Sequence, residues 1–312
     1  MLGITTRPRF RFGSLRCVSS RALVPGLALA LVLLASSQAE ARIFADGFES
    51  GDFSAWSGVV GLQPTVFRIS DLDLRDPHVF APVDVGIVIC VDFTDDPLPV
   101  VDFAFNGSLE EQITTDGDGD GFLDLSSLLV FRPFFVNAAM SERVDFDDGQ
   151  CTAPLASTIC GPDPATTQLE TIYSNLMAGT CLETVAGTTS SYDPAVTEPD
   201  APCFSTVAET FTFQLGELEI ELEDLQLAGT FVGLPVTGFT SGLLRGFLSE
   251  AAADAILLPD ELPLVGGQPL SILLPGGSGA CSDDDDRDLH NGVLGWWFYF
   301  NFEAEKVPVM GF

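Results

Sequence analysis

Six cysteines constrain the fold of this chain more than any other feature of its sequence. They are Cys90, Cys151, Cys160, Cys181, Cys203 and Cys281, and a seventh, Cys17, precedes them. An even number of cysteines in an exported chain is typical of a disulfide framework, and six allow fifteen connectivities. Four of the six fall in a turn-rich stretch, so we expect those four to pair among themselves and Cys90 to pair with Cys281. A zinc site is the weaker alternative, because Cys-x-x-Cys is absent and only His78 and His290 could assist.

Residues 1–41 have the three parts of an export signal. Five arginines come first, the apolar run Leu27–Ala35 follows, and Ala39 and Ala41 provide small residues for cleavage before Arg42. The apolar run is too short to cross a bilayer, which takes about 20 residues, and no later run approaches that length. We therefore expect a secreted, periplasmic or cell-surface protein with no transmembrane helix.

The remaining chain is strongly acidic. Removing residues 1–41 takes away five of 13 Lys and Arg and one of 45 Asp and Glu, which leaves a formal charge of −36. Nucleic acid is excluded as a partner because phosphate binding needs clustered basic residues, and Lys306 is the one lysine. The 25 phenylalanines still allow a buried core. Such a surplus of negative charge indicates bound cations or a strongly hydrated surface.

Apolar runs and alternating patterns predict a chain made mainly of β-strands. Val85–Phe93 is a continuous apolar run, as in a strand covered on both faces, and Phe122–Phe135 can hold a strand and a turn at Pro133. Strict alternation returns over 211–223. Residues 145–209 are rich in turn-forming residues and cysteine, so we expect a disulfide-linked surface excursion there.

Two of the predicted strands could carry a binding surface. Four glutamates, Glu217, Glu219, Glu221 and Glu223, share one strand face. A solvated outer face accounts for them better than a cation site does, because neighbouring charges about 7 Å apart in water repel by only about 0.6 kcal/mol. Val293–Phe302 contains Trp296 and Trp297, which could stack on sugar rings if exposed; a buried central strand is the better interpretation.

One helix is expected, over Ser241–Leu257. Its apolar residues recur at three- and four-residue steps, Ser241 stands where a cap would lie, and Pro259 ends the pattern. The fold class is therefore mainly β: a single β-sandwich or jelly-roll-like domain over residues 65–312, with one amphipathic helix, after an N-terminal segment and linker at 42–64.

The segment 42–57 carries a first resemblance. Its pattern Asp-Gly-Phe-Glu-Ser-Gly-Asp resembles a segment that often follows the signal in exported bacterial proteins. It is also similar to the opening strand of jelly-roll carbohydrate-binding modules. The resemblance implies a carbohydrate or cell-surface ligand.

Asp116–Asp124 is the stretch whose residue types and spacing specify a chemistry. Asp116, Asp118 and Asp120 stand at positions 1, 3 and 5 of a loop that glycines allow to curl, Phe122 offers its carbonyl at position 7, and Asp124 stands at position 9. Hard oxygen ligands at these offsets suit Ca²⁺. The alternative is an Asp-Gly hairpin turn without metal.

This loop resembles the calcium loops of EF-hands, dockerins and thrombospondin type 3 repeats. It departs from them at position 12, where Ser127 replaces the acidic ligand. We expect strands on both sides, Glu110–Thr115 before and Leu123–Phe131 after, and hence a structural ion. An acid from 145–148 could complete its shell. The acidic run Asp283–Asp286 is a weaker candidate for a second ion, since charge runs are usually solvated.

Signals for catalysis are few. Neither histidine accompanies a Gly-x-Ser-x-Gly motif, and no pair of carboxylates is singled out. The leading hypothesis is a secreted, Ca²⁺-stabilised, non-catalytic binding module. The alternatives are a polysaccharide hydrolase acting through paired carboxylates and a structural protein of an extracellular matrix.

Overall fold

Strands dominate the computed structural model, which describes residues 64–84, 86–98, 103–137, 141–163, 166, 169–215, 218–260, 262 and 264–310. The predicted export signal at 1–41 and nearly all of the segment 42–64 lie outside these residues. The strands are β1 (Thr65–Asp76), β2 (Phe80–Asp84), β3 (Val88–Asp92), β4 (Ser127–Arg132), β5 (Ser141–Cys151), β6 (Cys160–Pro162), β7 (Leu169–Leu176), β8 (Cys203–Thr206), β9 (Glu209–Leu215), β10 (Leu218–Val232), β11 (Gly238–Ser249), β12 (Asp288–His290) and β13 (Val293–Lys306).

The helices are short. They are α1 (Phe105–Thr114), α2 (Glu250–Ala255) and the 3₁₀ turns η2 (Leu155–Ser157) and η3 (Leu270–Leu273). None of the helices in the described residues is long and apolar enough to cross a membrane.

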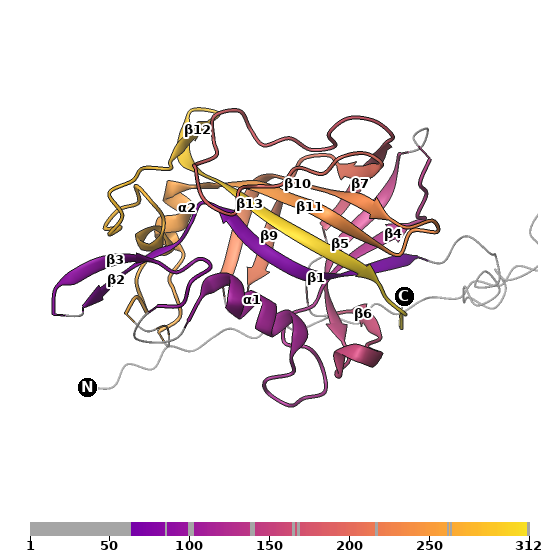
Figure 1. The fold of residues 1–312 in the computed structure, drawn as a ribbon, viewed down its shortest axis with the longest axis horizontal. Coiled ribbons are helices and arrows are strands. Elements are labelled where there is room, and N and C mark those ends of the chain that lie inside the picture. Colours follow the sequence, from indigo (N-terminus) through magenta and orange to yellow (C-terminus); the bar gives the residue numbers. More distant parts are fainter. Residues whose placement is uncertain are drawn as a thin grey trace, which may run out of the picture. The chain divides into compact units, whose positions relative to one another are not determined.

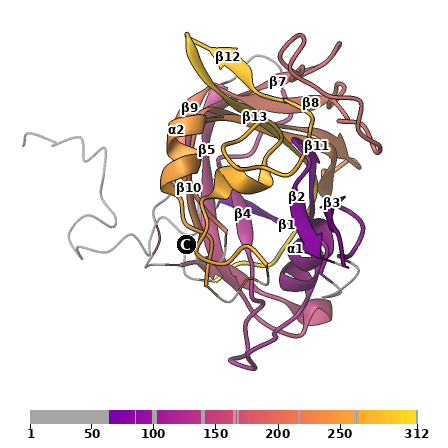
Figure 2. The ribbon, with the colours of Figure 1, turned by 90° about the vertical axis from the view of Figure 1, so that its left-hand side faces the viewer.

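The large sheet closes on itself. Eight strands follow one another in the order β1-β4-β5-β7-β8-β10-β11-β13, and β13 pairs again with β1, so that the sheet forms a closed cylinder. Every pairing in this ring is antiparallel. Its two halves face each other across one core (Figures 1 and 2). The predicted mainly β class is confirmed, with the β2–β3 hairpin as a second, small sheet.

The core fills the inside of the cylinder. At one end it is aromatic: Phe67 and Phe239 have ring centroids 4.4 Å apart, and Phe131 contacts both rings. β13 supplies Phe300 and Phe302 to this interior and Trp297 and Tyr299 to a second cluster outside. The buried central strand predicted at Val293–Phe302 is therefore confirmed from Gly295 onward, whereas Val293 and Leu294 are exposed.

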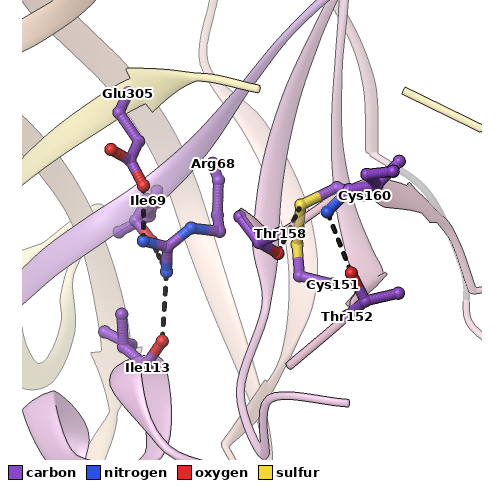
Figure 3. The surroundings of a disulfide bond; sticks show 9 residues. Arg68, Ile69, Ile113, Cys151, Thr152, Thr158, Cys160 and Glu305 are labelled. Atoms are coloured by element: carbon purple, nitrogen blue, oxygen red, sulfur yellow. Dashed lines mark hydrogen bonds and ion pairs between the residues drawn. A yellow bond between two sulfur atoms is a disulfide. The ribbon is translucent and has the colours of Figure 1, made fainter. Parts of the chain in front are cut away.

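Disulfides hold irregular segments against the cylinder. The pairs are Cys90–Cys281, which was predicted, and Cys151–Cys160 and Cys181–Cys203, which agree with the expectation that the other four cysteines pair among themselves without having been singled out by it. The second joins β5 to β6, near the buried Arg68 of β1 (Figure 3). The third joins β8 to an irregular segment whose Cys181, Val185 and Val196 pack against the cluster of Trp297 and Tyr299.

Several predicted elements were wrong. Most of the helix predicted at Ser241–Leu257 is strand β11; only its end is helical, in α2, and the cap is Ser249, whose hydroxyl accepts a hydrogen bond from the amide of Ala252 at 3.2 Å. Alternate residues of β11 face the inner and outer clusters, so both sets are apolar. The strand predicted at Glu110–Thr115 is instead the end of α1, where Leu109 and Ile113 are buried one turn apart.

Two further expectations need correction. β3, within the run Val85–Phe93, is an exposed hairpin strand, with Val88 70% exposed. The excursion predicted at 145–209 contains most of β5 and all of β7 and β8, which belong to the ring; its longest irregular part is 177–202.

Candidate functional site

The predicted calcium loop lies between α1 and β4. One ligand oxygen from each of Asp116, Asp118 and Asp120 comes within 4.8 Å of the others. In the described part of the chain, no ion pair with Arg, Lys or His neutralises these three carboxylates. Three hard oxygen donors gathered at one point form a partial coordination sphere for Ca²⁺.

Backbone amides shape the loop. The Asp116 carboxylate accepts hydrogen bonds from the amides of Gly119 at 2.8 Å and Gly121 at 3.0 Å. Both glycines have positive φ, +77° and +96°, which other residues adopt only with strain. The glycines between the acids therefore allow the curl that the sequence predicts.

Asp124 and Phe122 take different places from the three clustered acids. The amide of Gly117 donates a hydrogen bond to the Asp124 carboxylate, with 3.0 Å to each of its two oxygens. A Cβ at Gly117 would lie 2.7 Å from Asp124 Oδ2, so a larger residue there would displace the Asp124 carboxylate. Phe122 donates its amide to Asp120 at 2.8 Å and forms a bridge with Thr152. Asp124 thus ties the loop's end back to its start.

The loop is attached to the sheet on one side. The amide of Leu123 donates to the carbonyl of Cys151 at 2.8 Å, and that of Ala153 to Gly121 at 2.9 Å. Cys151 is also fixed by its disulfide (Figure 3).

On its other side the loop is attached to α1. The amide of Asp124 donates to Thr115, and that of Leu125 donates to Gln112 at 2.9 Å. Arg68 holds the same helix end, because its guanidinium donates to the carbonyl of Ile113 at 3.0 Å and to Glu305 at 2.7 Å (Figure 3). The loop therefore connects a helix to the sheet, not two strands.

Sequence reasoning missed the acid that faces the loop. Asp163, Gln150 and Gln112 line the same depression as Asp118 and Asp120. The predicted cluster 145–148 contributes indirectly, because the amide of Asp163 donates to the carbonyl of Asp148 at 2.9 Å. Burial and repulsion by Asp163 raise the pKa of Asp148 to about 6. Asp163 lies three residues after Cys160, whose disulfide with Cys151 brings this part of the chain to the loop. That pairing is the one sequence signal that could have predicted its position.

The Asp147 carboxyl group, in the neighbouring strand β5, is buried without a hydrogen-bond partner. It is 1% exposed, and neither oxygen has a hydrogen-bond partner. Burial and the neighbouring Asp145 raise its pKa to about 6. Asp145 itself is held by Arg132 at 2.7 Å and Arg143 at 2.5 Å.

The other candidate surfaces are accounted for by packing. Glu219, Glu221 and Glu223 are exposed, as a solvated face requires, while Glu217 lies outside the described residues. Trp296 and Trp297 are buried and present no platform for sugars.

The run Asp283–Asp286 does not converge on one point. Asp285 binds Arg287 at 2.8 Å, and Asp286 accepts from Ser190 at 2.8 Å and from Tyr192. Of the described residues, only Asp116, Asp118 and Asp120 form a group that could hold a metal ion.

The two histidines contact residues outside the loop. His78 Nδ1 is 2.6 Å from Asp92 Oδ2, and its ring stacks on Tyr192 with centroids 3.8 Å apart. Burial raises the pKa of Asp92, but hydrogen bonds from His78 and Thr94 outweigh it and the net pKa is lowered. His290 pairs with Asp224 at 2.8 Å and lies against Trp297.

An apolar cavity of about 210 Å³ lies inside the cylinder at the end opposite the aromatic cluster. β1, β10 and β13 provide its sheet side, with Leu74, Ile220 and Phe300 among them, and α1, β2 and η3 line its other side. Among the described residues that line it, only Ser108 and Gln112 are polar and none is charged.

Comparison of the chain with protein-family models, curated proteins and solved structures found no match. The site must therefore be interpreted from its own geometry.

Proposed function

We propose that this protein is an exported, Ca²⁺-stabilised, non-catalytic binding module that acts outside the cytoplasm. The observation that carries the calcium part is the convergence of Asp116, Asp118 and Asp120 within 4.8 Å. Carboxylates so close repel one another unless a cation joins them. The predicted export signal, the three disulfides and the acidic charge all suit a calcium-rich, oxidising compartment.

A structural role for the ion follows from the loop's attachments. α1 precedes the loop, and β4 begins at Ser127, which is buried in the sheet instead of acting as a twelfth-position ligand. An ion here would fix α1 against the cylinder. Asp163, Gln150 or water would complete its coordination.

The test is thermal unfolding of the oxidised protein with CaCl₂, with MgCl₂ and with EGTA. We expect Ca²⁺ to raise the melting temperature, because it binds the folded chain only, and Mg²⁺ to do so less. The variant Asp118→Asn with Asp120→Asn should lose the Ca²⁺-dependent shift.

A charge-matched control separates specific binding from screening. Asp283→Asn with Asp284→Asn removes the same charge from an exposed run outside the loop. This control should keep the full shift. Equal melting temperatures with CaCl₂ and EGTA would contradict the proposal.

A further inference from the structure

The cavity inside the cylinder is the feature that packing leaves unexplained. Protein interiors fill their space, and voids larger than a water molecule are few. This pocket, about 210 Å³, is larger than the engineered apolar cavities of about 150 Å³ that bind benzene. It has walls from the sheet, from α1 and from η3, so it belongs to the finished fold.

We propose that this cavity binds a small, uncharged, apolar molecule with at most one hydroxyl group, of which medium-chain primary alkanols are the representative class. This inference deepens the proposed function, because it names the ligand class of the binding module. Scaling from benzene, the cavity holds roughly eight to ten non-hydrogen atoms.

The charge of the ligand follows from the lining. No Arg, Lys or His among the described residues lines the cavity, so a carboxylate inside would be buried without a partner. The formal charge of −32 for the whole chain also repels anions. A fatty acid anion is therefore a poor ligand, whereas the alcohol of the same length is a good one.

The two polar residues specify one hydroxyl. Gln112 donates from its Nε2 to the carbonyl of Ser108 at 3.1 Å and to its hydroxyl at 3.3 Å. The donor side of the Gln112 amide is thus engaged, and we assign its oxygen as the acceptor for a ligand O–H; Gln112 stands between this cavity and the depression beside Asp118 and Asp120, and lines both. Both residues lie on one side of α1, which places the hydroxyl at the helix wall and the alkyl chain toward Phe298 and Phe300.

The test is calorimetric titration of the oxidised protein with primary alkanols from butanol to decanol, with CaCl₂ and with EGTA. We expect affinity to rise about fourfold per added methylene, the factor that apolar transfer gives, and to stop rising near octanol. Octanoate should bind at least tenfold more weakly than octanol. Absence of binding, a continuous rise through decanol, or equal affinity for octanoate would overturn the inference.

Two variants test the location. Ala81→Leu extends a buried lining residue into the cavity and should weaken octanol binding at least tenfold without lowering the melting temperature; Ala251→Leu, exposed on α2, should leave affinity unchanged. Phe300→Leu enlarges the cavity and should move the best chain length upward. If both lining variants left the chain-length profile unaltered, the cavity would not be the site.

Failure of one proposal can be distinguished from failure of the other by combining the alkanol titrations with the thermal melts in CaCl₂ and in EGTA. Alkanol binding with no Ca²⁺-dependent melting shift would overturn the calcium proposal and leave the cavity inference standing. A Ca²⁺-dependent melting shift with no alkanol binding would overturn the cavity inference and leave the calcium proposal standing.

Discussion

Single carboxyl groups in this acidic chain differ greatly in their surroundings. Asp76, at the end of β1, is 2% exposed and accepts a hydrogen bond from the amide of Ser190 at 2.6 Å. Burial raises its pKa to about 7, and Asp286 adds to the effect while the Ser190 amide opposes it. The folded chain therefore holds a proton on Asp76 that the unfolded chain releases.

Asp76→Asn should remove a pH dependence of stability. In the wild type, the free energy of unfolding falls as pH rises from the unfolded pKa of 3.8 to the folded pKa of about 7, because only the unfolded chain ionises in that window. Asparagine keeps the acceptor for Ser190 and does not ionise. Urea denaturation between pH 4 and 7 should show a flatter profile for the variant.

The exposed substitution Glu223→Gln is the control and should keep the wild-type slope. Asp147 and Asp148 have raised pKa values as well, so the variant's slope should diminish and not vanish. A variant profile parallel to the wild type would show that Asp76 ionises normally.

At the scale of elements, the sequence predicted strands better than helices. Leu243, Leu244 and Phe247 fit a helical period, but β11 is covered on both faces, so the rule of alternation that marks a half-buried strand does not apply. In α1 the helical signal was present: Phe105, Leu109 and Ile113 follow one another at steps of four. The residues between them, Asn-Gly-Ser and Glu-Glu-Gln, are polar or glycine, and they obscured this helical signal.

Some features of the candidate site could be predicted from the sequence and others could not. Aspartates at alternate positions and glycines between them are local features, so the convergence of Asp116, Asp118 and Asp120 could be predicted. The opposing Asp163 and the cavity depend on which strands become neighbours, and no spacing within the sequence encodes that. Clustering of four cysteines in one turn-rich stretch made Cys90–Cys281 predictable, but it left open how the four pair with one another.

The loop and the helix before it should respond oppositely to alanine. Gly121→Ala has space for its Cβ, but φ of +96° makes it cost about 1 kcal/mol or more. Gly107→Ala lies within α1, where the new Cβ meets Ala104 at an ordinary 3.6 Å, and should stabilise by about 0.5–1 kcal/mol. Thermal melts of the two variants should move in opposite directions.

EGTA gives the control for this pair. The loss at Gly121→Ala should be larger with Ca²⁺ than with EGTA if the curled loop is the ion-binding form. A stabilising effect of Gly121→Ala would mean that the loop does not hold this backbone conformation in solution.

For the whole molecule, the three disulfides should contribute unequally. Their sequence separations are 191 for Cys90–Cys281, 22 for Cys181–Cys203 and 9 for Cys151–Cys160. Loop-closure entropy gives losses of about 5, 3 and 2.5 kcal/mol on removal. Guanidinium denaturation of paired Cys→Ser variants should rank the first above the second; the third also loses buried packing, so its rank is not diagnostic. A larger loss for Cys181–Cys203 than for Cys90–Cys281 would contradict the view that loop length sets how much each disulfide stabilises the fold.

The pairing of β1 with β13 joins strands from the two ends of the described chain, with Phe67 opposite Lys306. A chain emerging from the ribosome can form the β4–β5–β7 ladder early, but it cannot complete the ring until its last strand has been made. Until then β1 has one open edge able to pair with another molecule. Every truncation before β13 should therefore aggregate instead of forming a smaller soluble domain, and biogenesis must shield the chain over its entire length before it folds.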